Sequence, residues 1–180
     1  MYPIAHVVVA SGAAWSAERV VRRLFRRQPA GAGNAQLRAS NGSLFDYRLV
    51  ALGALMPDMI DKPLAWWFLA DRLEDDHLVA HTLLFWLVLA IPAMYLAWRG
   101  ERSLISVAAG VVAHRLCDPM WNEGDTLIWP LSAWTFDHST GPDFATYLVM
   151  ELAAAAALLV VLRRLWLRDR MFLLFSAGQI

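Results

Sequence analysis

The sequence predicts an all-α, polytopic membrane bundle with about five hydrophobic segments, and three observations support this fold class. The 180 residues suit a single membrane-embedded domain over 1–180. Hydrophobic residues make up 58% of the chain and charged residues 18%, which is more apolar surface than a soluble core of this size could bury. Apolar runs of helical length recur, without internal repeats or extended β alternation. We therefore expect helices packed within a lipid bilayer.

The first two apolar segments differ in their continuity. Residues 4–17 form an apolar run that leads into an arginine-rich end. Residues 28–45 have the glycine, serine and asparagine content of a flexible loop, which we place in the cytoplasm. Residues 49–70 are apolar but contain Pro57 and Pro63, together with two aspartates. A short helix, a polar break and an interfacial segment are therefore expected there.

The remaining three segments are more regular. Residues 78–98 contain no Asp, Glu, Lys or Arg, and at about 1.5 Å per residue they could cross about 30 Å of hydrocarbon. Residues 104–113 are uninterrupted and rich in small side chains, and residues 144–162 are interrupted only by Glu151. We expect Glu151 to face the bundle, where it either pairs with Arg115 or supports a polar site. All three segments are predicted to be helices.

The distribution of basic residues predicts the orientation. They follow the first, third and fifth segments, at Arg19, Arg22, Arg23, Arg26, Arg27, Arg38, Arg48, Arg99, Arg102, Arg163, Arg164, Arg168 and Arg170. Residues 119–143 contain none. By the positive-inside rule the N-terminus lies outside, the C-terminus inside, and 119–143 is an extracytoplasmic loop of an inner-membrane protein. The 16 basic and 16 acidic residues cancel, so no bulk positive field indicates a nucleic-acid partner.

Histidine and aspartate carry the candidate chemistry. In this topology the five histidines come from different segments but lie near the outer side: His6, His77, His81, His114 and His138. If their segments are helical, three pairs share a face by spacing, namely His77 with His81, His114 with Asp118, and Asp58 with Asp61. Imidazole nitrogen mixed with carboxylate oxygen suits a divalent metal ion, Zn²⁺ first and Mn²⁺ or Fe²⁺ next. Each residue alone also has a plain explanation as a helix end or an interfacial group. The hypothesis therefore depends on their convergence.

Three short blocks, at residues 53–61, 77–82 and 114–118, with Gly124 and the turn at 127–130, resemble the membrane-bound metal-dependent hydrolase family of bacteria and archaea. The resemblance spans roughly residues 6–130 and implies metal-binding roles for His6, Asp58, His81, His114 and Asp118. The chain departs from the family pattern at two places. Two residues separate Asp58 from Asp61 where the pattern has one, and Asp76 stands where the family has a histidine, with His77 next to it. Asp61, Asp76 and His77 are thus additional candidates.

More distantly, this family resembles the zinc-dependent phospholipase C and single-strand nuclease group, which implies phosphoester hydrolysis. We therefore expect a membrane-embedded metal-dependent hydrolase, with Asp61 or Asp76 accepting the proton of the attacking water. Tryptophans and the lack of basic residues in 119–143 favour an amphipathic or lipid-like substrate at the outer face. One alternative is a protein that binds or transports a metal without catalysis. Another is a b-type haem protein, which would use two histidines and no carboxylates.

Overall fold

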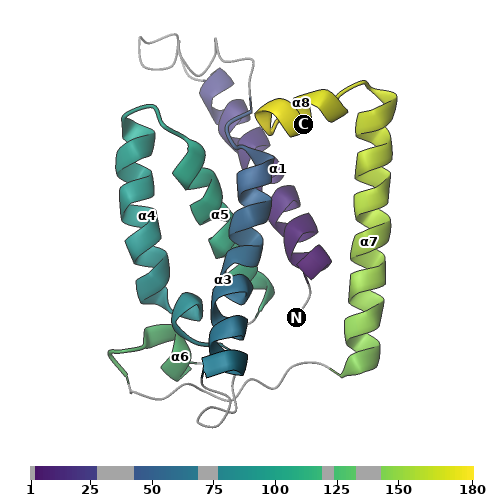
Figure 1. Cartoon of the computed structure of the whole chain (residues 1–180). Coiled ribbons are helices and arrows are strands. Elements are labelled where there is room, and N and C mark those ends of the chain that lie inside the picture. Colours follow the sequence, from purple (N-terminus) through teal and green to yellow (C-terminus); the bar gives the residue numbers. More distant parts are fainter. Residues whose placement is uncertain (1–2, 28–42, 69–76, 119–123, 133–142) are drawn as a thin grey trace.

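The computed structural model describes residues 3–27, 43–68, 77–118, 124–132 and 143–180, and these are helical without any strand (Figure 1). The predicted all-α class is confirmed for this part of the chain. The elements are α1 (Pro3–Arg27), α3 (Tyr47–Phe68), the 3₁₀ turn η1 (Val79–His81), α4 (Leu83–Trp98), α5 (Ser103–Cys117), α6 (Gly124–Ile128), α7 (Phe144–Leu167) and α8 (Met171–Ala177).

Helices α3 and α5 pack closely because two glycines face each other's backbone. A Cβ atom on Gly53 would lie 2.1 Å from the Val107 carbonyl oxygen, and one on Gly110 would lie 2.2 Å from the Val50 carbonyl oxygen. Neither contact is possible for a larger residue, since the obstacle is backbone. The close approach places His114, one turn after Gly110, directly against α3.

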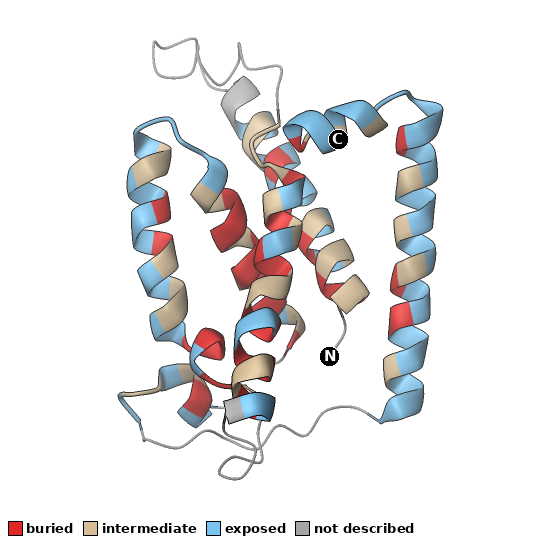
Figure 2. Cartoon of the chain, in the orientation of Figure 1, coloured by how far each residue is buried: buried red, intermediate tan, exposed pale blue. Residues whose placement is uncertain are grey.

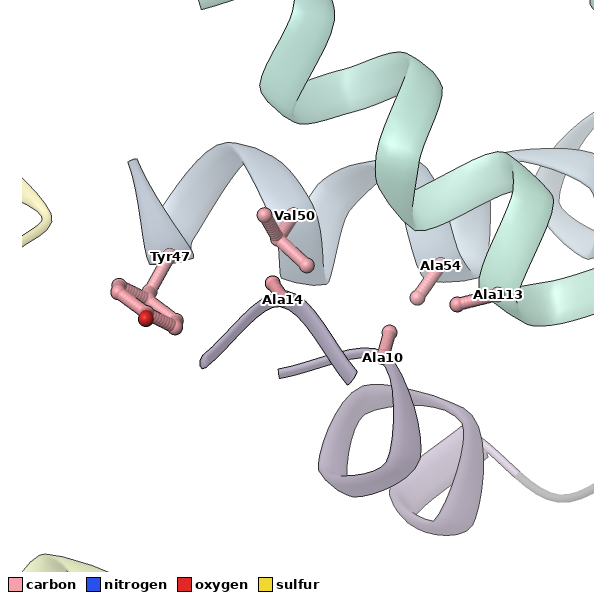
Figure 3. Packing of buried hydrophobic residues seen from close by; sticks show 6 residues of the cluster. All are labelled: Ala10, Ala14, Tyr47, Val50, Ala54 and Ala113. Carbon is pink, nitrogen blue, oxygen red and sulfur yellow. The ribbon is translucent and has the colours of Figure 1, made fainter. Parts of the chain in front are cut away.

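Helix α1 completes the core against α3 and α5 with small side chains. Figure 3 shows this cluster, which consists of Ala10, Ala14, Tyr47, Val50, Ala54 and Ala113. Four of the six are alanines, so the three helices approach closely without large interdigitating side chains. The buried residues in Figure 2 concentrate on these helices and on η1.

Helix α3 corrects the prediction for residues 49–70, because it continues through both prolines for 22 residues. A proline lacks the N–H that would bond the carbonyl four residues earlier, so Pro57 leaves the Gly53 carbonyl without its helical partner. Close packing on α5 holds this stretch in line. The predicted polar break is therefore wrong, and Asp58 and Asp61 lie on a continuous helix.

Helix α4 begins later than predicted from residues 78–98. Thr82 is its N-cap, with Oγ1 accepting a hydrogen bond from the Phe85 N–H at 3.1 Å, and the preceding residues form η1. The 16 residues of α4 extend about 24 Å, less than the hydrocarbon thickness of about 30 Å.

Helix α7 is, within the described residues, the one helix long and apolar enough to cross a membrane. Most of its 24 residues are exposed in the isolated chain (Figure 2). Helices α4 and α5 are apolar but shorter. Helix length therefore does not establish the five hydrophobic segments expected from the sequence as five membrane crossings.

The two predicted loops contain more structure than expected. Residues 28–42 lie outside the described part, but Phe45 packs against the core cluster and Ser43 donates a hydrogen bond to Glu18 at 2.6 Å. Within 119–143, residues 124–128 form α6.

Helix α8, which was not predicted, returns the C-terminus to the start of α3. The Tyr47 N–H donates to the Gly178 carbonyl at 2.8 Å. Gly178 has φ +62°, a left-handed conformation that ends α8 and favours glycine.

Candidate metal centre

Four buried side chains converge at the end of the molecule where α3 and α5 finish and α1 begins (Figure 1). They are Asp58 from α3, His81 from η1, and His114 and Asp118 from the end of α5. One ligand atom from each lies within 4.8 Å of all the others. The convergence on which the metal hypothesis depended is therefore present.

The two histidines are oriented by hydrogen bonds on the far side of each ring. His114 Nδ1 lies 2.7 Å from the Ala54 carbonyl oxygen, and His81 Nδ1 lies 2.8 Å from Asp61 Oδ2. Because both partners are acceptors, each Nδ1 carries the hydrogen. A ring whose one hydrogen is on Nδ1 presents the lone pair of Nε2, and the two Nε2 atoms lie only 3.1 Å apart.

Two lone pairs at this separation repel unless a cation lies between them. Ligands about 2.0–2.1 Å from a tetrahedral zinc ion are separated by about 3.3 Å, close to the distance seen here. The carboxylates add donors to the same point. Asp118 Oδ2 is 3.3 Å from His114 Nε2, and Asp58 Oδ1 is 3.9 Å from His81 Nε2. A proton shared by the two histidines would involve only their two Nε2 atoms, whereas four potential ligand atoms converge here.

The two other predicted histidines lie at the edge of this group. His6 Nε2 is 3.0 Å from Asp118 Oδ1, and its ring stacks on His114 with centroids 4.2 Å apart. His77 Nε2 is 4.0 Å from Asp118 Oδ2, and its ring lies 4.4 Å from that of His81. His6 is therefore within hydrogen-bonding distance of Asp118, whereas His77 Nε2 lies beyond that distance from it.

The prediction that His77 and His81 share a helix face is wrong, although the two rings are close. His77 precedes η1, and only His81 belongs to that single turn. The i, i+4 spacing fails because Thr82 starts α4 after both histidines. By contrast, His114 and Asp118 do meet across one turn at the end of α5, as their spacing predicted.

Asp61 holds the backbone around His81. Its carboxylate accepts hydrogen bonds from the N–H groups of Leu78 at 2.8 Å, Ala80 at 2.9 Å and His81 at 3.1 Å, in addition to the His81 ring. Arg115 donates to the carbonyl oxygen of His81 from the other side. This arrangement favours a role for Asp61 in positioning His81 over its predicted roles as ligand or proton acceptor. Asp76 and His138 lie outside the described residues.

Lys62 is a component of the site that the sequence analysis missed. Its ammonium group contacts Asp58 Oδ1 and both side chains are buried, while Asp58 Oδ2 is buried with no hydrogen-bond partner in the described part of the chain. The spacing of Asp58 and Lys62 could have revealed this ion pair, because residues four positions apart on a helix lie side by side. Asp58 therefore keeps one oxygen available for an ion or a proton.

Comparison with known proteins gives the family. A family model described as the YdjM inner membrane protein matches residues 1–178. The chain belongs to this inner membrane protein family. Curated proteins and solved structures provide no significant match. The inner-membrane location predicted from composition is therefore confirmed, and membership implies association with the lipid bilayer.

Proposed function

We propose that the protein is a membrane-embedded metal-dependent hydrolase whose site holds one divalent ion, with zinc the first choice. The observation that carries the metal proposal is the pair of Nε2 lone pairs at 3.1 Å, oriented by Asp61 and the Ala54 carbonyl. An ion held there supplies Lewis acidity, which lowers the pKa of water towards neutrality and polarises a phosphoryl or carbonyl oxygen.

The buried charges support a single ion. Three carboxylates, from Asp58, Asp61 and Asp118, lie with two cations, Lys62 and Arg115, in the same buried region. With neutral histidines one negative charge remains uncompensated, and burying such a charge is costly. One divalent cation changes this to a single positive charge, which an anionic phosphoester can balance, whereas two ions would leave three positive charges.

Asp58 is the side chain best suited to accept a proton during hydrolysis. Its Oδ1 is held by Lys62, and its Oδ2 is the buried oxygen that lacks a partner in the described structure. Because Asp61 is saturated with hydrogen bonds, the proton-accepting role proposed from the sequence passes to Asp58, with Asp76 remaining a candidate.

The orientation with the site outside is also part of this proposal. Figure 1 places the end of α1, the α4–α5 connection and the end of α7 at the opposite end of the molecule from the site. The arginines of these regions, Arg19, Arg22, Arg23, Arg99, Arg102, Arg163, Arg164, Arg168 and Arg170, therefore gather away from the metal centre. The positive-inside rule then gives an outside N-terminus and an inside C-terminus, with α1, α3, α4 and α5 crossing beside α7.

We further propose an amphipathic phosphoester, such as a phospholipid, as substrate. Trp66 and Trp67 are exposed at the end of α3, which is the site end, and such rings prefer the membrane interface. A substrate anchored there could present its headgroup to the ion.

The test begins with the wild-type protein purified in detergent. Elemental analysis should find about one equivalent of divalent metal, and a screen of aryl phosphates, phospholipids and carboxylic esters should find hydrolysis that a chelator abolishes. Asp118→Ala should lose both metal and hydrolysis. Asp125→Ala, which changes an exposed aspartate on α6, should retain both.

The second candidate is metal binding or transport without hydrolysis. It is favoured by the crowding of the site. His6 and His77 add metal-coordinating nitrogens around Asp118, and these could fill every coordination position. Stoichiometric metal with no hydrolysis across the screen would select this candidate. Absence of metal from the purified protein, with none taken up on addition, would exclude both.

A further inference from the structure

We propose that Glu151 of α7 is a positioning residue for His6, so that the membrane-spanning helix controls the geometry of the metal centre. This inference rests on the proposed metal site. It concerns a residue of α7 that lies outside that site.

Glu151 binds the first turn of α1 from another helix. Its Oε2 accepts a hydrogen bond from the Ile4 N–H at 3.2 Å, and its Oε1 accepts one from the Ala5 N–H at 3.4 Å. The first N–H groups of a helix have no partner within that helix. A carboxylate there satisfies them and interacts favourably with the positive end of the helix dipole. Glu151 therefore acts as an N-terminal cap supplied by α7.

The hydrogen bonds between Glu151 and the first turn of α1 form the polar centre of the interface between α7 and α1. Of the 24 residues of α7, only Glu151, Ala154 and Leu165 are buried. Ala154 packs with Ala5, and Tyr147 lies on the same side. Tyr147, Glu151 and Ala154 are spaced four and three residues apart, so they form one face of α7 directed at the start of α1.

His6 is the next residue after the two that Glu151 binds. It is fully buried, and its Nε2 lies 3.0 Å from Asp118 Oδ1. The backbone of residues 4 and 5 thus connects the carboxylate of α7 to a histidine at the metal centre. If that carboxylate is removed, the first turn of α1 loses both partners and can unwind, which releases His6 from Asp118.

The test measures Co²⁺ binding to the full-length protein in detergent, by chelator competition and by the visible absorption spectrum. His6→Ala should weaken Co²⁺ binding and change the spectrum. Glu151→Ala should weaken binding about tenfold, as loss of residues that orient ligands does, and change the spectrum in the same direction. Glu151→Gln, which keeps one acceptor oxygen, should give an intermediate loss.

The double variant distinguishes positioning from general destabilisation. In the His6→Ala background, Glu151→Ala should produce no further loss of Co²⁺ affinity, because its effect passes through His6. Glu18→Ala is the matched control. It removes the other buried glutamate contact of α1, at the far end of the helix, where Glu18 accepts from Ser43 and Tyr47. It should lower thermal stability while leaving the affinity and spectrum unchanged.

Three results would overturn the inference. The first is unchanged Co²⁺ affinity in Glu151→Ala, and the second is an equal loss with and without His6. The third is a wild-type protein that binds no Co²⁺, which would overturn the proposed function as well. The first two leave the proposed function intact, so the two failures can be told apart.

Discussion

Helices α5 and α7 are both apolar but have opposite surroundings. In α5, eight of 15 residues are buried, including His114 and Arg115. In α7, three of 24 are buried. The difference lies in the position of glycine and polar residues, since Gly53 and Gly110 bring the backbones of α3 and α5 together, whereas Glu151 is the one polar residue buried on α7. Apolar content alone therefore does not distinguish a helix that packs on protein from one that faces lipid.

The largest expected effect comes from breaking the glycine contact. Gly53→Val should prevent folding, because a Cβ there would lie 2.1 Å from the Val107 carbonyl oxygen, a backbone atom that cannot rotate away. The measurement is the yield of monodisperse protein in detergent. Gly12→Ala on α1, where a Cβ meets nothing within 4 Å, should fold normally and gain up to about 1 kcal/mol from helix propensity. Normal folding of Gly53→Val would show that the two helices do not require this approach.

The second prediction concerns the exposed surface of α7. Ala156 is exposed near the middle of this helix, so Ala156→Arg should oppose membrane insertion by about 2–3 kcal/mol. The fraction of α7 that integrates into membranes, measured by glycosylation of a reporter, should fall accordingly. Ala156→Leu should integrate like the wild type. Equal integration of both variants would mean that this surface does not face lipid.

The third prediction concerns the substitution Asp61→Asn at the buried polar site. It removes the negative charge that orients His81 Nδ1 and weakens the bonds to the η1 backbone. We expect metal affinity to fall about 10- to 100-fold, the usual effect of losing a residue that orients a ligand. Chelator competition provides the measurement. Asp143→Asn, which replaces the N-cap of α7 with an equally good one, is the control. If Asp61→Asn instead bound metal normally and lost hydrolysis, Asp61 would be the proton acceptor.

The smallest expected effect is a loss of folding stability at Asp46, at the opposite end of the molecule from the metal centre. The hydrogen bond from Arg48 lowers the pKa of Asp46 below its ordinary value of 3.8. A lowered pKa means that the pair stabilises the folded state above about pH 4 and that this contribution is lost as the pH falls through the folded pKa. Because Arg48 is exposed, Asp46→Asn should cost less than about 1 kcal/mol at pH 7. The loss, measured by denaturant unfolding, should shrink below pH 4, and a constant difference would contradict it.

The features predicted from the sequence are those set by local spacing. Helices α5 and α7 follow from long apolar runs, and the meeting of His114 with Asp118 follows from helical periodicity. The continuity of α3 could not be predicted, because tolerance of Pro57 depends on packing against α5. The turn that carries His81 was missed for a similar reason, since Asp61, 20 residues away, forms its hydrogen bonds. Glu151 was expected to face the bundle, but its partners are backbone N–H groups, which no sequence pattern identifies.

The hydrogen bond between the Tyr47 N–H and the Gly178 carbonyl has a consequence for biosynthesis. The first turn of α3 cannot receive this partner until residue 178 has been synthesised, after all of α7 has been added to the chain. Ile180, which packs against the core cluster, arrives later still. Helices α1, α3 and α5 can associate during translation, but their contact with the C-terminal segment must form later. The last contacts of the core therefore form only after residue 180 has been synthesised.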